Sequence, residues 1–220
     1  MKSKRVITMV RRNRFLMLAS VGLVATIGLS GCGSEPSQSV LPEDSTVVAL
    51  GDSLTYGYGA NAETAYPAVL ADLSRWTVVN AGINGDTSAD VLARVDNVIK
   101  QAPDLVLLGI GGNDVLQRVT PDTTLANISA TIDSLESADI DVVLIAEPHL
   151  STSALFGKAS DNPLYEDIAE AKDVPLYSDG WSTVLSDDTL KSDRIHANAA
   201  GYRQFAEGLY GYLVEEGWAR

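Results

Sequence analysis

The chain has 220 residues, with 29 acidic and 16 basic side chains and a formal net charge of −13. A surface this acidic argues against nucleic acid, or an anionic membrane, as an electrostatic partner. Cys32 is the single cysteine of the sequence, so an internal disulfide is excluded.

The first 31 residues are expected to form an export signal rather than part of a fold. Six basic side chains lie among residues 2–14, and residues 15–29 then run without a charge. This apolar run is short for a membrane span and is followed by small residues, which is the order of a secretory signal. Removal of residues 1–31 takes away six basic and no acidic side chains, which brings the net charge from −13 to near −19.

The segment Leu29-Ser30-Gly31-Cys32 resembles the lipobox of bacterial lipoproteins. In that family the leader is cleaved before the cysteine, and the cysteine thiol carries a diacylglycerol. The resemblance implies lipidation of Cys32 and a place in the cell envelope, anchored to a membrane and facing the periplasm or the exterior. Residues 32–45 are polar and lack periodicity, so we expect a tether that holds the domain roughly 20 Å from the anchor.

Residues 46–220 have the right size for one domain with one core. Short β-branched runs alternate with longer amphipathic segments along this part of the chain. The expected strands are residues 46–50, 77–80, 104–108, 141–146 and, more weakly, 174–177. The expected helices are residues 63–74, 86–101, 122–138, 162–172 and 199–216. Apolar strands separated by helices predict an α/β fold of three layers, α/β/α, with a five-stranded parallel sheet.

In such a sheet the binding crevice lies beyond the carboxyl ends of the strands. The first expected strand leads into Gly51-Asp52-Ser53-Leu54-Thr55, where a serine at a strand-to-helix turn can expose its hydroxyl. Thr55 stands where a G-x-S-x-G elbow would have its second glycine. Asp52 is expected to be a structural hydrogen-bonding residue of this turn.

A serine becomes a nucleophile only when a base can reach it. The chain has two histidines, and His196 follows Asp193 by three residues, immediately before the last expected helix. This spacing places both side chains on one side of a turn, so the Asp193 carboxylate can orient the imidazole and stabilise its charged form. We therefore expect Ser53, His196 and Asp193 to be the catalytic residues.

Two further strand ends carry candidate donors for an oxyanion. Gly85 precedes a helix after the second strand and can offer a backbone N–H, and Asn113 follows the third strand with a side-chain amide. Each segment alone is better explained as a flexible turn with a helix cap.

Together the four segments resemble the conserved blocks of the SGNH (GDSL) hydrolase superfamily over residues 46–202. The matching blocks are Gly-Asp-Ser-Leu, Asn-x-Gly-x-x-Gly-Asp-Thr, Gly-Gly-Asn-Asp, and Asp-x-x-His followed by Ala-Asn-Ala-Ala-Gly-Tyr. The nearest branch is the bacterial periplasmic one with esterase, thioesterase and lysophospholipase activity. The resemblance implies a flavodoxin-like sheet, a Ser–His–Asp triad without metal or cofactor, and an oxyanion hole made by the Ser53 N–H, the Gly85 N–H and the Asn113 side chain.

The expected activity is hydrolysis of carboxylic acyl esters, such as short-chain or aryl esters or lysophospholipids, through an acyl-enzyme. His149 and Phe156 follow the fourth strand and are candidates for a wall of the acyl pocket, although a surface loop and a core contact explain them equally well. The expected partners are the acyl-ester or lysolipid substrate and the membrane, reached through Cys32. The sequence does not define an oligomeric state, and a monomer is assumed.

Two alternatives stay open, an acetylesterase acting on envelope polysaccharide and a non-catalytic envelope lipoprotein with the same fold. Decay to a binding protein would be expected to erase at least one of the site residues. Two other functions are disfavoured. A dinucleotide-binding site is disfavoured because the glycine-containing run of residues 57–62 starts too late after its strand. A metal-dependent phosphoesterase is disfavoured because it would need a tight cluster of metal ligands, which the sequence lacks.

Overall fold

Five parallel strands form one sheet in the computed structural model, which describes residues 40–149 and 159–220. The strands are β1 (Thr46–Gly51), β2 (Thr77–Gly82), β3 (Leu105–Gly109), β4 (Asp141–Ile145) and β5 (Leu176–Tyr177). Their spatial order is β2-β1-β3-β4-β5, and every neighbouring pair is parallel. This is the strand order of flavodoxin-like folds, so the predicted parallel sheet is confirmed.

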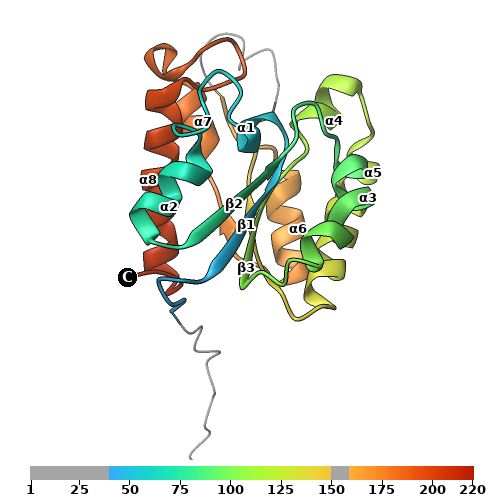
Figure 1. Ribbon diagram of the computed structural model, residues 1–220. Coiled ribbons are helices and arrows are strands. Elements are labelled where there is room, and N and C mark those ends of the chain that lie inside the picture. The colour runs from blue at the N-terminus through green and yellow to red at the C-terminus, as the bar shows by residue number, and fades with distance from the viewer. Residues whose placement is uncertain (1–39, 150–158) are drawn as a thin grey trace, which may run out of the picture. The chain divides into compact units, whose positions relative to one another are not determined.

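Helices cover both faces of the sheet (Figure 1). One face carries α2 (Tyr66–Ser74), α7 (Gly180–Leu185) and α8 (Ala199–Glu215), and the other carries α3 (Ser88–Ile99), α5 (Pro121–Glu136) and α6 (Leu164–Lys172). Alternate residues of β1 serve the two cores: Val47 and Ala49 pack with the first set of helices, and Val48 and Leu50 with the second. Because both faces of the sheet are buried, the central strands read as continuous apolar runs.

The helices begin where local hydrogen bonding allows it. The Thr87 side chain and the Asp90 side chain form a capping box, so α3 begins at Ser88 rather than at the expected residue 86. Ala65 has extended backbone and Pro67 lies in the first turn of α2, so this helix begins at Tyr66 instead of residue 63.

Three short helices and one 3₁₀ turn were not anticipated from the sequence. They are α1 (Ser53–Tyr56), α4 (Gly112–Gln117), α7 and η2 (Asp188–Leu190). Each has six residues or fewer, which is too short for an apolar period of 3.6 residues to be recognised. Two of them begin at or next to the expected site residues, since α1 starts at Ser53 and α4 includes Asn113.

The first described residues lie at the opposite end of the sheet from α1 (Figure 1). There the Leu41 N–H donates to the Trp218 carbonyl, and the Ser45 carbonyl accepts from Thr77 at the start of β2. Along residues 40–149 and 159–220, no helix combines the length and apolar character needed to cross a membrane. The expected lipidation residue Cys32 and the expected wall residue Phe156 lie outside the described residues.

Candidate active site

Ser53 is the first residue of α1, in a tight turn at the carboxyl end of β1. Asp52 caps this helix, because its Oδ1 accepts the Leu54 N–H at 2.9 Å. Gly51 is required at the strand end, since a Cβ there would lie 2.2 Å from the Gly109 carbonyl oxygen and 2.3 Å from Thr55 Oγ1. The turn therefore presents Ser53 at the edge of the sheet where the other strand ends also meet.

The three expected catalytic residues form a continuous chain of contacts. His196 Nε2 lies 3.1 Å from Ser53 Oγ, although 143 residues separate them, and His196 Nδ1 lies 2.8 Å from Asp193 Oδ2. Asp193 Oδ1 also accepts the backbone N–H groups of Ile195 and His196, at 2.9 and 2.8 Å. Partial burial raises the pKa of Asp193, but the hydrogen bonds from the His196 ring and from these two N–H groups outweigh it and leave that pKa below its usual value. Asp193 is thus an anion oriented toward the imidazole.

Tyr58 lies over the His196 ring, a contact that no sequence pattern indicated. The two ring centroids are 4.4 Å apart and the planes are tilted by 40°. The Tyr202 hydroxyl donates to the Tyr58 carbonyl at 2.8 Å, which holds the backbone of this segment in place. A Cβ on Gly59 would lie 2.0 Å from Ser192 Oγ, so glycine allows this segment to approach the His196 loop closely.

Two of the three expected oxyanion donors are unengaged. The backbone N–H groups of Ser53 and Gly85 make no hydrogen bond to any described residue. Asn113 differs, because its Nδ2 donates to Asp52 Oδ2 at 3.1 Å and to the Asp86 carbonyl at 2.9 Å. The Asn113 amide is therefore held beside both the Ser53 turn and the segment that follows Gly85.

Arg94 of α3 fixes the segment after β2 to the end of β1. Its Nε donates to Asp86 Oδ2 at 2.7 Å and its Nη2 to the Gly51 carbonyl at 2.9 Å. Nothing in the sequence pattern singled out Arg94, because both of its partners lie outside its own helix.

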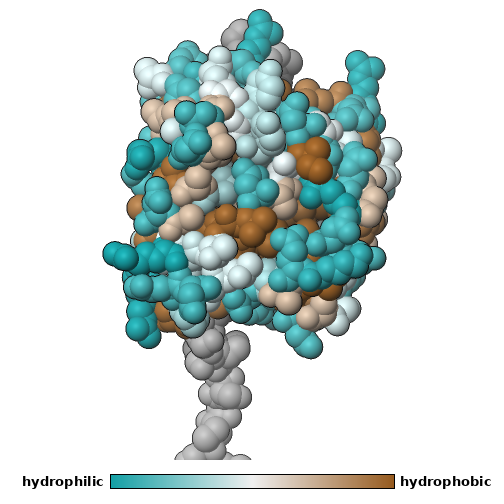
Figure 2. Space-filling view, viewed as in Figure 1, coloured by the Kyte–Doolittle hydropathy of each residue, from teal (hydrophilic) through white to brown (hydrophobic). Residues whose placement is uncertain are grey.

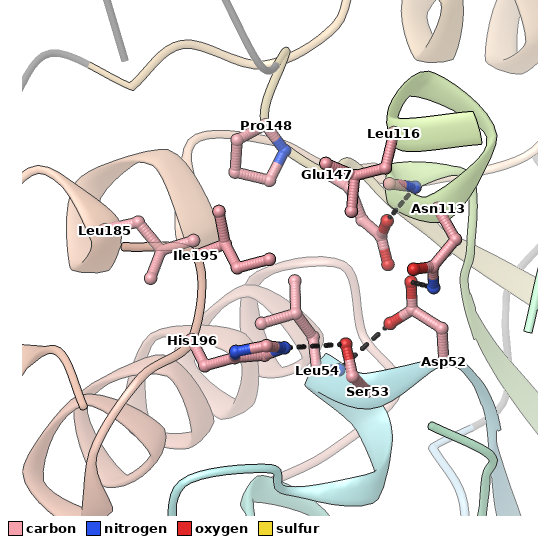
Figure 3. A pocket seen from close by; sticks show the side chains of 11 residues that line it. Asp52, Ser53, Leu54, Asn113, Leu116, Glu147, Pro148, Leu185, Ile195 and His196 are labelled. Atoms are coloured by element: carbon pink, nitrogen blue, oxygen red, sulfur yellow. Dashed lines mark hydrogen bonds between the residues drawn. The ribbon is translucent and has the colours of Figure 1, made fainter. Parts of the chain in front are cut away.

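An open cavity of about 370 Å³ lies above Ser53 (Figure 3). It is lined by Asp52, Ser53, Leu54, Gly112, Asn113, Leu116, Glu147, Pro148, Leu185, Ile195 and His196. Its walls are mainly apolar, and the polar groups gather around the Ser53 hydroxyl. His149, expected as a candidate wall residue, is exposed and is not among the lining residues. The neighbouring residue Pro148, which is buried, lines the cavity instead.

Three carboxyl groups are buried behind the cavity, namely Asp52, Asp114 and Glu147, each at most 2% exposed. Asp114 accepts from the Ser88 N–H at 2.8 Å, from Ser88 Oγ at 2.5 Å and from Thr124 Oγ1 at 3.1 Å. Burial raises the pKa of Asp52 to about 7, the charges of Asp86 and Asp114 add to this rise, and the Leu54 N–H opposes it. The expectation that Asp52 is a structural hydrogen-bonding residue agrees with these contacts.

Within residues 40–149 and 159–220, no cluster of three His, Cys, Asp or Glu side chains could hold a metal ion. The chemistry that the described site can perform is nucleophilic attack by a hydroxyl, assisted by an imidazole and a carboxylate.

Proteins of known name resemble this chain over most of its length. Thioesterase 1/protease 1/lysophospholipase L1 of Escherichia coli (strain K12) is 34% identical over 160 residues, which are 70% of this chain and 76% of the relative. The arylesterase of Vibrio mimicus is 31% identical over 179 residues, which are 77% of this chain and 88% of the relative.

Solved structures share the fold. The esterase AlinE4, of the SGNH-hydrolase family, has a TM-score of 0.60 and 26% identity, over 80% of this chain and 98% of its own. The psychrotrophic esterase EstA from Pseudoalteromonas sp. superimposes with a TM-score of 0.68 at 24% identity, over 79% of this chain and 98% of its own, and shows likeness of fold. Residues 49–204, a range that includes the Ser53 turn and the His196 loop, match the model of the GDSL-like Lipase/Acylhydrolase family. This chain belongs to that family.

Proposed function

We propose that this protein is a serine esterase that hydrolyses carboxylic acyl esters with Ser53, His196 and Asp193. The observation that carries the proposal is the chain of contacts from Ser53 Oγ to His196 Nε2 at 3.1 Å and from His196 Nδ1 to Asp193 Oδ2 at 2.8 Å. Relatives named as an arylesterase and as a thioesterase and lysophospholipase support the same reaction class.

The reaction proceeds by two acyl transfers. Ser53 Oγ attacks the ester carbonyl while His196 Nε2 takes its proton, and the imidazolium that forms is stabilised by the Asp193 carboxylate. His196 then returns the proton to the leaving alcohol, and an acyl ester remains on Ser53. Water attacks this ester with the same base, releases the acid and restores the Ser53 hydroxyl.

The negative charge on the carbonyl oxygen needs hydrogen-bond donors. The N–H groups of Ser53 and Gly85 have no other partner among the described residues, so both can donate to it. Asn113 Nδ2 is the third donor. One of its hydrogens is now donated to the Asp86 carbonyl, at an Nδ2–O distance of 2.9 Å, and would be shared with the substrate oxygen. The Ser53 and Gly85 N–H groups are donors fixed in advance, so they cost no reorganisation when the charge develops.

The apolar lining of the cavity favours an acyl or aryl group without charge. Leu54, Leu185 and Ile195 lie on the His196 side of the cavity, and Leu116 and Pro148 lie across from them (Figure 3). We therefore expect short-chain and aryl esters to be hydrolysed, with lysophospholipid and acetylated polysaccharide as the further substrates to compare.

The test is hydrolysis of p-nitrophenyl acetate, butyrate and a long-chain ester by the full chain in detergent. Wild type, Ser53→Ala and His196→Ala are compared, and circular dichroism checks that each is folded. The proposal expects turnover in wild type and a loss of about 10³-fold or more in both variants. A fluorophosphonate probe should label wild type and fail to label Ser53→Ala. Folded wild type that neither turns over an ester nor takes the label would overturn the proposal.

The lipid anchor belongs to the same proposal. A diacylglycerol on Cys32 would hold the enzyme in the cell envelope, on the periplasmic or outer side of a membrane. The first described residues lie at the end of the sheet away from α1 (Figure 1). Incorporation of an alkyne fatty acid in producing cells should label wild type and not Cys32→Ser. Equal labelling of both would contradict the anchor.

A further inference from the structure

Glu147 is a buried carboxyl group with no assigned part in the triad or the oxyanion hole. It follows β4 directly, is 1% exposed and lines the cavity above Ser53. Its Oε2 accepts the Gly112 N–H at 2.6 Å, next to Asn113 in the first turn of α4. Figure 3 shows its carboxyl group pointing toward Asn113 and Asp52 rather than outward. Glu147 therefore contacts the helix turn that presents Asn113.

The surroundings of Glu147 do not compensate a negative charge. Its Oε1 is buried and makes no hydrogen bond in the described part of the chain. None of the ion pairs formed among described residues includes Glu147. An ionised carboxylate with one donor and no cation is costly to bury, and a neutral carboxylic acid costs much less.

A second carboxyl group lies beside it. The point where a Cβ on Gly112 would stand is 2.9 Å from Glu147 Oε2 and 3.7 Å from Asp52 Oδ2, so the two acids flank the same backbone position. Asp52 holds Asn113 by its side chain, while Glu147 holds the preceding N–H. Two neighbouring buried carboxyl groups do not both ionise readily, because like charges at short range repel.

We infer that Glu147 is a positioning residue of the hydrolytic site, which keeps its proton at neutral pH and, as a neutral acid, fixes Gly112 and Asn113 without placing a second negative charge behind the oxyanion. This inference rests on the proposed esterase function. Burial, the charge of Asp52 and the charge of Asp114 raise the pKa of Glu147 well above its usual range, against the opposing Gly112 N–H. Asp52 accepts hydrogen bonds from Leu54 and Asn113, whereas Glu147 accepts one from Gly112, so a negative charge is better stabilised on Asp52 than on Glu147.

The titratable and charged groups around this position come from several elements. They are Asp52 before α1, Asp114 in α4, Asp86 with its partner Arg94, Tyr66 of α2, Tyr165 of α6 and, across the cavity, His196. Most of these groups are acids, and the one cation among them is paired with Asp86. Ionisation of Glu147 at alkaline pH would thus add negative charge to an already acidic region and oppose the negative transition state.

The activity arm of the test compares Glu147→Gln and Glu147→Leu with wild type from about pH 6 to about pH 10. Glutamine resembles the protonated acid and keeps an acceptor for Gly112, so kcat at neutral pH should stay within about 3-fold of wild type. The fall of wild-type kcat at alkaline pH should be absent in Glu147→Gln. Leucine removes the acceptor, so kcat should drop about 10–100-fold while KM changes little.

Glu170→Gln is the matched control, because it removes one carboxylate from an exposed position of α6, a helix that packs next to β4. It should leave the pH profile of kcat unchanged.

The second arm does not depend on turnover. A group whose pKa is higher in the folded than in the unfolded chain stabilises the fold fully below its unfolded pKa, here the ordinary glutamate value of 4.5, and this stabilisation is lost as pH rises toward the folded value. Glu147→Gln has no such loss. Its Tm should therefore exceed that of wild type by at least about 2–4 °C at neutral to alkaline pH, and this gap should narrow near pH 4.5. Glu170→Gln should show no such trend.

The outcomes separate this inference from the esterase proposal. If Ser53→Ala abolishes turnover but both Glu147 variants retain it with the wild-type pH profile, the positioning role alone is overturned. Turnover that survives Ser53→Ala overturns the esterase proposal and the positioning role with it, and the Tm comparison then still decides whether Glu147 is protonated. A Tm gap between Glu147→Gln and wild type that does not change with pH shows that Glu147 is ionised in the folded chain and contradicts the inference.

Discussion

The side-chain amide of Asn113 donates to the carboxyl group of Asp52 at 3.1 Å, across 61 residues of sequence. The other Asp52 oxygen accepts the Leu54 N–H at 2.9 Å and so caps the helix that begins with Ser53. One buried side chain therefore fixes the nucleophile turn and the amide donor relative to each other. This relationship places Asp52 between the Ser53 turn and Asn113, two parts of the proposed oxyanion hole.

Asp52→Asn should lower kcat about 10–100-fold and change KM little. If the new amide oxygen keeps the Leu54 contact, its NH₂ group faces the NH₂ group of Asn113, and two donors cannot bond to each other. Steady-state kinetics with p-nitrophenyl butyrate measures the effect. Asp187→Asn is the control, since Asp187 also caps a turn, through the Thr189 N–H at 2.8 Å, but is exposed. Wild-type kcat in Asp52→Asn would show that the Asp52–Asn113 contact is dispensable.

Asp193→Asn should lower kcat about 10²–10⁴-fold without unfolding the protein. The amide cannot stabilise the imidazolium that forms when His196 takes the Ser53 proton. Hydrolysis rates and the rate of fluorophosphonate labelling should fall together, because both depend on the same base. Labelling at the wild-type rate would indicate that a different group activates Ser53.

Acid should remove the stabilisation that Asp193 provides. Because its pKa in the folded chain is lower than the ordinary 3.8, this stabilisation is complete above about pH 3.8 and is lost as pH falls through the lower folded value. The Tm difference between wild type and Asp193→Asn should therefore be constant near neutral pH and shrink in strong acid. A difference that persists at the lowest pH would mean that the Asp193 charge is not its source.

Tyr58→Leu should lower kcat about 2–5-fold, the effect of losing an aromatic face beside a transient cation, about 0.5–1 kcal/mol at an exposed site. The Tyr58 and His196 ring centroids lie 4.4 Å apart. Tyr58→Phe keeps the ring and should retain wild-type kcat, and Tyr56→Leu controls for the loss of an exposed tyrosine in the same segment. Equal effects of Tyr58→Leu and Tyr56→Leu would exclude a specific role of the ring.

Gly85→Ala should reduce stability by about 1–2 kcal/mol and kcat by at least about 10-fold. Gly85 has a φ of +93°, and a Cβ there would meet nothing within 4 Å, so the cost is backbone strain rather than a clash. Relief of that strain would turn the Gly85 N–H away from the oxyanion. Gly217→Ala is the matched control, because Gly217 has a φ of +83° and equally open space at the far end of α8. Both variants should lose stability, and only Gly85→Ala should lose activity.

The sheet and its helices were predictable from residue patterns alone. Each central strand is a short apolar run that is buried on both faces, and a helix of nine or more residues follows within the same crossover, as in β1, α2 and β2. These patterns can be recognised in the sequence because a parallel sheet that is buried on both faces admits few polar residues. The motif residues after these strands could be found for the same reason, since every parallel strand delivers its carboxyl end to one edge.

The contacts that tune the site were not predictable in this way. Tyr58 lies on His196, Arg94 reaches both Asp86 and Gly51, and Glu147 holds Gly112 across 35 residues. None of these pairs repeats with a helical or strand period. His149 shows the reverse case. Its position after β4 suggested the cavity, but its side chain is exposed and Pro148 lines the cavity instead.

The sequence by itself determined the chain order of the five strands and the five longer helices, the turn that holds Ser53 and the His196–Asp193 pair, because each depends on neighbours only a few residues away. The tertiary structure alone decided that His196 lies 3.1 Å from Ser53, that Asp52 and Glu147 are buried side by side, and which side chains line the cavity. These are properties of packing between distant segments. The desolvation that raises the pKa values of Asp52 and Glu147 arises only when those segments exclude water together.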